Sequence, residues 1–216
     1  KLTSLFATQD MTQGSPSGNL IRFSVPLLIG NLAQQLYSTV DSIVVGAYVG
    51  DTALAAVGAS GPILNLVLVL VMGISVGARV MVSQYYGAKD RERLEETIGT
   101  TITATVVSSI FIMIVGPLIT PPVMSLLGTP EEIHDMACTY LIIQFAGIIG
   151  TAFYNILSGV LRGLGDSVMP VIFLIIACLL NIVLDVWFVA GFHWDVAGVA
   201  IATIISQIVS GSLCLI

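Results

Sequence analysis

Long, nearly uncharged apolar segments follow one another along this chain and limit what it can fold into. Each is long enough to cross the hydrocarbon core of a membrane, which takes about 20 helical residues. Of the 216 residues, 56% are hydrophobic and only 9% are charged, whereas a soluble domain carries about 25% charged residues. In lipid the backbone must satisfy its own hydrogen bonds, so we expect the segments to be helices.

The segments predict an all-α membrane protein with six spans, at about 22–49, 52–83, 98–119, 136–161, 168–190 and 196–216. Residues 1–18 are polar and lack the ordered regions of a signal peptide. We therefore expect a cytosolic leader at 1–18 and a six-helix domain at 19–216. The sixth segment runs to the end of the sequence without a closing polar loop, which indicates a fragment or a half-size protein.

The basic residues predict the orientation, because all of them fall at span ends that share one side of the membrane. They are Lys1, Arg22, Arg79, Lys89, Arg91, Arg93 and Arg162. The positive-inside rule places that side, and with it the N-terminus, in the cytoplasm. The chain has no basic patch or basic helix of the kind that binds nucleic acid. Its expected surroundings are a lipid bilayer rather than a nucleic-acid partner.

Two acids, Asp41 and Asp185, stand inside apolar runs in which each is the sole charge. A charged side chain in hydrocarbon costs several kcal/mol, so such residues normally face a cavity and carry ions, protons or substrate. On the first span, Gln34 and Tyr37 share a helical face with Asp41, at spacings of seven and four residues. On the fifth span, Asn181 precedes Asp185 by four residues and lies on the same face.

The topology places both acids in the outer half of the membrane. Thr203 lies about eight residues into the sixth span, or about 12 Å, and reaches a similar depth. These groups could converge on one cation site, or they could simply form hydrogen bonds that pack the helices. If the two acids are close together, they cannot easily both ionise, and they would titrate as a coupled pair. Carboxylates, a carbonyl and a hydroxyl could hold Na⁺ as readily as a proton.

Three further residues have two interpretations each. Pro26 lies early in the first span and predicts either a static kink or a hinge that moves Asp41. Tyr140 and Gln144 share a face of the fourth span and would line a cavity or satisfy one another.

The chain carries no phosphate-binding loop, zinc-protease motif or nucleophile elbow. We therefore expect neither an enzyme nor a cofactor or metal centre.

Several sequence runs resemble the multidrug and toxic compound extrusion (MATE) family, in its DinF-like prokaryotic branch. They are PLLIGNLAQQLYSTVDSIVVGAYVGDTALAAVG at 26–58, SVGARVMVSQYYGAKDRERL at 75–94, LSGVLRGLGDSVMP at 157–170, LLNIVLDVWFV at 179–189 and WDVAGVAIATIISQ at 194–207. The resemblance covers about 11–216, in the family's order and spacing. It implies the N-terminal lobe of a twelve-helix transporter in the prokaryotic cytoplasmic membrane, with the C-terminal lobe, or a second copy in its place, as a partner.

The resemblance also implies a function. MATE proteins are secondary antiporters that use a proton or sodium gradient to export small organic compounds, often cationic. Asp41, Asn181, Asp185 and Thr203 match the family's N-lobe cavity, and Tyr37 and Pro26 match positions tied to that cavity and to bending of the first helix. Two alternatives stay open at this point. One is a flippase for lipid-linked substrates, which shares the architecture, and the other is a truncated lobe that does not transport.

Overall fold

The computed structural model describes residues 16–215, with side chains for residue 18 and for residues 24–215. In this range the elements are α1 (Pro16–Val44), η2 (Val45–Val49), α2 (Asp51–Gly87), α3 (Arg91–Leu126), α4 (Glu131–Ala146), α5 (Ile148–Gly163), α6 (Met169–Val186), η3 (Trp187–Gly191) and α7 (Asp195–Leu213). The elements η2 and η3 are single π-helical turns that continue α1 and α6. The all-α class predicted from the sequence is confirmed. Residues 1–15 of the expected leader lie outside the described residues.

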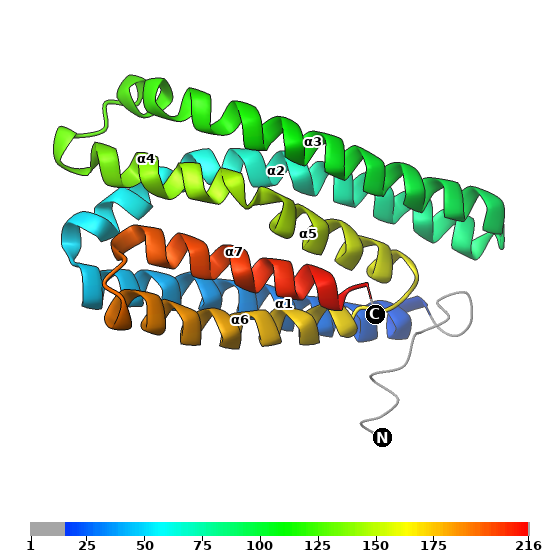
Figure 1. Ribbon diagram of the computed structural model, residues 1–216. Helices are drawn as coiled ribbons and strands as arrows, with labels where there is room; N and C mark the ends of the chain where they lie inside the picture. Colours follow the sequence, from blue (N-terminus) through cyan, green and yellow to red (C-terminus); the bar gives the residue numbers. More distant parts are fainter. Residues whose placement is uncertain (1–15, 216) are drawn as a thin grey trace.

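Most of the helices have the length and composition of membrane spans. Among the described residues, α2, α3, α6 with η3, and α7 are long and apolar enough to cross a membrane, and the bent pair α4–α5 would be a fifth span. Helix α1 has 29 residues, but polar residues between Asn31 and Ser42 keep it out of this set. It packs along α6 as the sixth long helix of the bundle (Figure 1).

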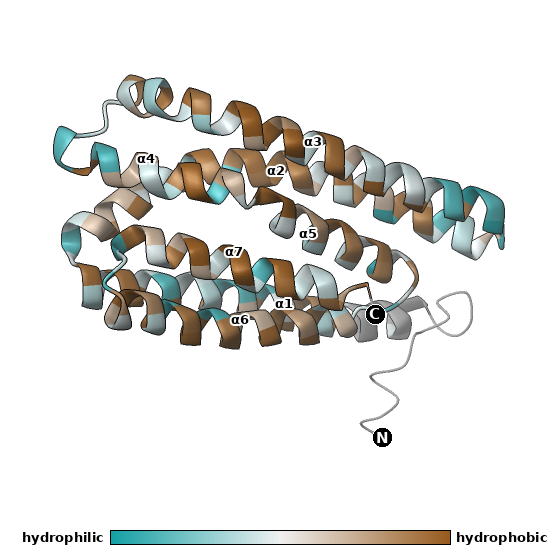
Figure 2. Cartoon of the chain, in the orientation of Figure 1, coloured by the Kyte–Doolittle hydropathy of each residue, from teal (hydrophilic) through white to brown (hydrophobic). Residues whose placement is uncertain are grey.

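The helices form layers that place α6 and α7 beside α1. Helices α1 and α6 lie at one edge, α7 packs on α6, α2 and α4–α5 follow, and α3 lies at the far edge (Figure 1). Apolar residues cover the middle of the helices, and polar ones gather at their ends, most clearly where α2 meets α3 (Figure 2). There Asp90 caps α3 by accepting a hydrogen bond from the backbone N–H of Arg93 at 3.2 Å.

The fourth span is bent rather than continuous. Helices α4 and α5 meet at an angle of 51°, whereas the sequence led us to expect one unbroken span at about 136–161. Gly147 stands at the break, and a Cβ there would collide with the side chain of Ile204 on α7. One turn later, Gly150 brings α5 against the backbone of Ile208, so that a Cβ at Gly150 would lie 3.1 Å from the Ile208 nitrogen. The bend therefore follows α7 at backbone distance.

Candidate functional site

Five polar side chains from three helices meet toward the η2–η3 end of the bundle, and we call them the acid cluster. They are Tyr37 and Asp41 of α1, Asn181 and Asp185 of α6, and Thr203 of α7. Asn181 and Asp185 are fully buried and Tyr37 is 4% exposed, whereas Asp41 and Thr203 are half-buried. Because α6 packs against both α1 and α7, its polar face lies at the centre of the cluster.

The Asn181 amide bridges the two carboxylates. With its nitrogen facing them, it donates to Oδ1 of Asp41 at 2.7 Å and to Oδ2 of Asp185 at 3.2 Å. Amide orientation is assigned from such hydrogen bonds rather than seen directly, and only this orientation satisfies both acceptors. One short side chain thus ties the charge of α1 to the charge of α6.

Thr203 supplies the contribution of α7. Its hydroxyl donates to the carbonyl oxygen of Val199 at 2.9 Å, which leaves its lone pairs free to accept. The Tyr37 hydroxyl lies close enough to Thr203 to interact with it. Asp41 also lies within hydrogen-bonding reach of Thr203. The threonine is therefore the point where α1 is fastened to α7.

The acid pair resists double ionisation. Asp41 and Asp185 lie within hydrogen-bonding reach of each other, and no Lys or Arg side chain among the described residues acts on either one. Two negative charges at that range repel strongly away from bulk water. A proton or a small cation between the carboxylates removes the repulsion. The arrangement is therefore suited to taking up a single positive charge.

Tyr140 of α4 adjoins the acid cluster, which the sequence raised only as one of two interpretations. It is 7% exposed, it lies beside Gln144 one turn along α4, and its hydroxyl lies near enough to Asp41 and Asp185 to interact with both charges. Tyr140 therefore adjoins both Gln144 and the acid cluster, and whether the pair lines a cavity stays a prediction. The signal in the sequence was the shared face of Tyr140 and Gln144, but spacing within one helix cannot say which other helix that face meets.

Two predicted residues lie apart from this group. The side chain of Gln34 is exposed. Its backbone carbonyl accepts a hydrogen bond from the Ser38 hydroxyl at 3.3 Å. Pro26 is half-buried inside α1, which stays helical through it. Gln34 belongs to the exposed polar face of α1 rather than to the acid cluster. Pro26 lies about four turns from Asp41, at 3.6 residues per turn, and contributes no atom to the site.

The groups of the cluster suit a proton or a small hard cation. Carboxylate, amide and hydroxyl oxygens are the donors that such cations take, whereas soft metals take thiolate or imidazole. Within the described part of the chain, no group of three or more His, Cys, Asp and Glu side chains could hold a metal ion. Asp41 and Asp185 are only two such side chains, and their neighbours are a neutral amide and hydroxyls, so the donor set suits a proton or Na⁺ better than a transition metal.

Comparison with known proteins gives a consistent result. The model of the MatE family matches residues 26–187. The probable multidrug resistance protein YpnP of Bacillus subtilis is 36% identical over 198 residues, which cover 92% of this chain and 44% of that protein. DNA damage-inducible protein F of Escherichia coli is 27% identical over 87% of this chain and 41% of that protein. The chain spans less than half the length of these curated relatives.

Solved structures share the fold. A MATE crystal structure in the bent conformation superimposes with a TM-score of 0.88 and 28% identity, over 96% of this chain and 47% of that one. A MOP superfamily transporter from Pyrococcus furiosus, described as having a binding pocket of reverse polarity, gives a TM-score of 0.89 and 28% identity, over 96% of this chain and 46% of that one. In both, the similarity covers one half of the longer protein.

Proposed function

The chain belongs to the MATE family of multidrug efflux transporters, and we propose that it forms the cation-coupling lobe of a secondary antiporter that exports small organic compounds. It is a membrane transporter rather than an enzyme. The observation that carries the proposal is the buried carboxylate pair, Asp41 and Asp185, joined by Asn181 and free of any basic partner in the described residues. Such a pair is costly in a membrane protein unless its charge is used.

The proposed mechanism is an exchange of cation against substrate. With a proton or Na⁺ between Asp41 and Asp185, the pair carries one negative charge fewer, and a cationic substrate loses electrostatic attraction to the cavity. When the cation leaves, repulsion between the two carboxylates pushes Asp41 away from Asp185. This movement disturbs the contact between Asp41 and Thr203. The cation shifts this equilibrium only to the extent that it binds the two arrangements with different affinity. Pro26, inside α1, is the proposed hinge for the movement.

Orientation and completion of the transporter are part of the same proposal. The basic residues of the α2–α3 connection favour a cytoplasmic position for that end of the bundle, in the inner or plasma membrane of a prokaryote. The chain then works with a second lobe, or with a second copy of itself, because the relatives it matches are more than twice its matched length. The central cleft forms between the two units.

A flippase for lipid-linked substrates is the second candidate, and the site argues against it. Such a substrate carries phosphate, which calls for basic side chains in the cavity. The acid cluster has none in the described residues, and Arg79 and Arg162 lie near each other toward the α5–α6 connection instead. The reverse-polarity pocket of the Pyrococcus furiosus protein shows that this fold carries cavities of different charge. The charge of the cavity, rather than the fold, therefore decides between the two candidates.

The test is the Asp41→Asn variant of the complete transporter in proteoliposomes, with ethidium as the exported cation. A proton gradient and a sodium gradient are applied in separate arms, so that the arm that drives export identifies the coupling ion. We expect Asp41→Asn to abolish export in that arm, because the neutral side chain no longer binds and releases a cation. The control is Asp51→Asn at the exposed start of α2, which should export normally. Unchanged gradient-driven export by Asp41→Asn would refute the proposal.

A further inference from the structure

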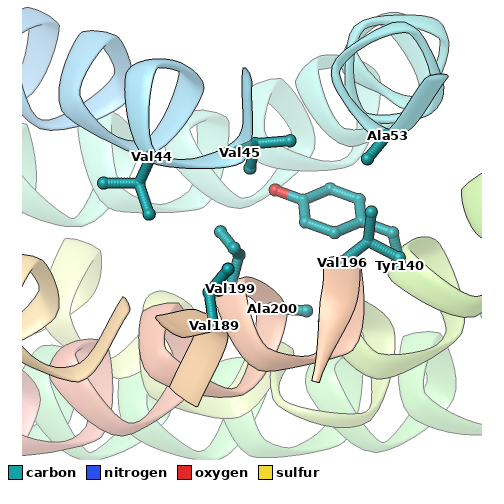
Figure 3. Packing of buried hydrophobic residues seen from close by; sticks show 8 residues of the cluster. All are labelled: Val44, Val45, Ala53, Tyr140, Val189, Val196, Val199 and Ala200. Carbon is teal, nitrogen blue, oxygen red and sulfur yellow. The ribbon is translucent and has the colours of Figure 1, made fainter. Parts of the chain in front are cut away.

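A compact apolar group closes the acid cluster on the side of η2 and η3. We call it the valine cluster, and its buried members are Val44, Val45, Ala53, Tyr140, Val189, Val196, Val199 and Ala200. They converge from α1, η2, α2, α4, η3 and α7 (Figure 3). Val45 and Ala200 are fully buried, and Val199 is 1% exposed.

The valine cluster lies directly beyond the acid cluster because the chain places its members one helical turn away. Val45 follows Asp41 by four residues, and Val189 follows Asp185 by four. Helix α7 runs the opposite way, so Val199, four residues before Thr203, falls on the same side. One turn is about 5.4 Å. The carboxylates therefore end against a dry layer rather than against solvent.

The two π-helical turns close the backbone around this layer. In η2 the N–H of Gly50 donates to the carbonyl of Val45, five residues back, at 3.1 Å, which is the wide turn of a π-helix. Turn η2 packs against η3, and both pack against α7. Gly198 allows the close packing of α7 against η3, because a Cβ at Gly198 would lie 3.2 Å from the Cβ of Phe188 in η3. The end of the site is thus sealed by main chain as well as by valines.

The exposure of the acid cluster lies on another side. Asp185 and Asn181 have no exposed surface, whereas Asp41 is half-buried and its neighbours Ser38 and Ser42 on α1 are exposed. The groups near Asp41 are Asn181, Asp185 and Cys178 on α6, Tyr140 on α4, Thr203 on α7, and Tyr37 on its own helix. All of them are neutral at ordinary pH except the second acid.

From this arrangement we propose that the valine cluster is a fixed seal and that the coupling cation enters and leaves past Asp41, along the exposed face of α1. Asp185 then receives a cation only after Asp41 has bound it. This inference rests on the proposed function, in which the acid pair binds the coupling cation. It adds the route of that cation and assigns a role to residues that carry no charge.

The first experiment measures which acid is reachable and needs no transport activity. The purified chain in liposomes is treated with a water-soluble carbodiimide and an amine nucleophile, which together label protonated carboxyl groups that water reaches. The reaction is run over a series of pH values, and the labelled peptides are quantified by mass spectrometry. We expect Asp41 to be labelled about tenfold faster than Asp185, because the reagent must pass Asp41 to reach Asp185. Labelling of Asp185 at the rate of Asp41 or above it would overturn the proposal.

The second experiment opens the seal. In the double variant Val45→Thr and Val189→Thr, two hydroxyl groups are buried in the apolar layer, where they favour hydration. We expect labelling of Asp185 to rise about tenfold, and proton leak through the liposomes, followed with an internal pH dye, to rise without added drug. Val183→Thr is the matched control, because Val183 lies on α6 and is 63% exposed. An unchanged Asp185 labelling rate in a folded double variant contradicts the seal.

The two proposals fail separately. If Asp41→Asn leaves export unchanged, the coupling function falls, but the labelling ratio still reports whether the valine cluster blocks access. If labelling shows both acids equally reachable while Asp41→Asn stops export, the coupling function stands and the route is wrong.

Discussion

Helices α1 and α7 each bring a side chain of the acid cluster, Asp41 and Thr203, to the central helix α6. The two helices differ in how many neighbours they pack against. Helix α7 packs against α4, α5 and α6 and against both π-helical turns, whereas α1 packs mainly against α6 and η2. Helix α7 also meets α5 at backbone distance through Gly150 and Gly211. In contrast, α1 turns a polar face with Gln34 and Ser38 outward.

This difference in packing suggests that Asp41, rather than Thr203, moves in the proposed mechanism. In the proposed mechanism Thr203 keeps its position because α7 packs against several helices, whereas Asp41 can move because α1 has few neighbours to displace. A switch needs one such low-cost element beside a rigid frame. Asp185 and Asn181, on the helix between them, act as the fixed reference against which α1 shifts.

The largest effect is expected from breaking the bridge between the two acids. Asn181→Ala removes the amide that donates to both Asp41 and Asp185, and loss of such a supporting partner typically lowers ion affinity by about 10- to 100-fold. The measurement is the proton or Na⁺ concentration that gives half-maximal export in the complete transporter. The matched comparison is Gln34→Ala, on the exposed face of α1, which should stay within about twofold of the parent. Equal losses from both variants would put Gln34 in the site and refute the cluster as drawn.

A smaller effect tests how firmly α7 is held. A Cβ at Gly150 would lie 2.7 Å from Cγ1 of Ile208 and 3.1 Å from its backbone nitrogen, so Gly150→Ala must push α5 and α7 apart. Overpacking of this kind costs about 1–3 kcal/mol, and thermal unfolding in detergent should show a lower midpoint. Gly73→Ala in α2 is the control, because no atom lies within 4 Å of a Cβ at that position. If both variants unfold at the parent temperature, α7 is not the rigid member.

The smallest effect concerns the contact between Tyr37 of α1 and Thr203 of α7. Tyr37→Phe removes the hydroxyl that interacts with Thr203, and a net hydrogen bond is worth about 0.5–1.5 kcal/mol. We expect Tyr37→Phe to lower the unfolding midpoint slightly, while Tyr48→Phe, at an exposed tyrosine of η2, leaves it unchanged. Combining Tyr37→Phe with Thr203→Val should cost less than the sum of the single changes. Additive losses in that double-mutant cycle would mean that the two hydroxyls do not interact.

Much of this arrangement could be foreseen from the sequence, because depth in a membrane is a coordinate that hydrophobic runs supply. The positions of Asp41, Asp185 and Thr203 within their runs placed them at one level, and the structure does bring their side chains together with Asn181. Helical spacing told which residues share a face. It did not tell which faces meet: Gln34 shares a helical face with Tyr37 by spacing, but its side chain is exposed in the described bundle whereas Tyr37 is buried.

The features that escaped prediction depend on contacts between helices rather than on local pattern. The 51° bend between α4 and α5 arises where Gly147 lets Ile204 approach, and no proline marks the spot. The π-helical turns after Asp41 and Asp185 insert one residue per turn at segments whose composition is ordinary for a helix. The valine cluster is likewise assembled from one residue each of five elements and three of α7, each of ordinary type for its own segment.

The positions of the first and last described helical residues have a consequence for any longer assembly. Helix α1 starts and α7 finishes at the same end of the bundle (Figure 1), so a chain that continues past α7 begins its next unit from the side where this one began. Two such units joined in tandem would have the same orientation in the membrane. They would be related by an axis along the membrane normal, as in transporters built from parallel repeats. Duplication of this unit needs no additional crossing to keep both copies in the same sense.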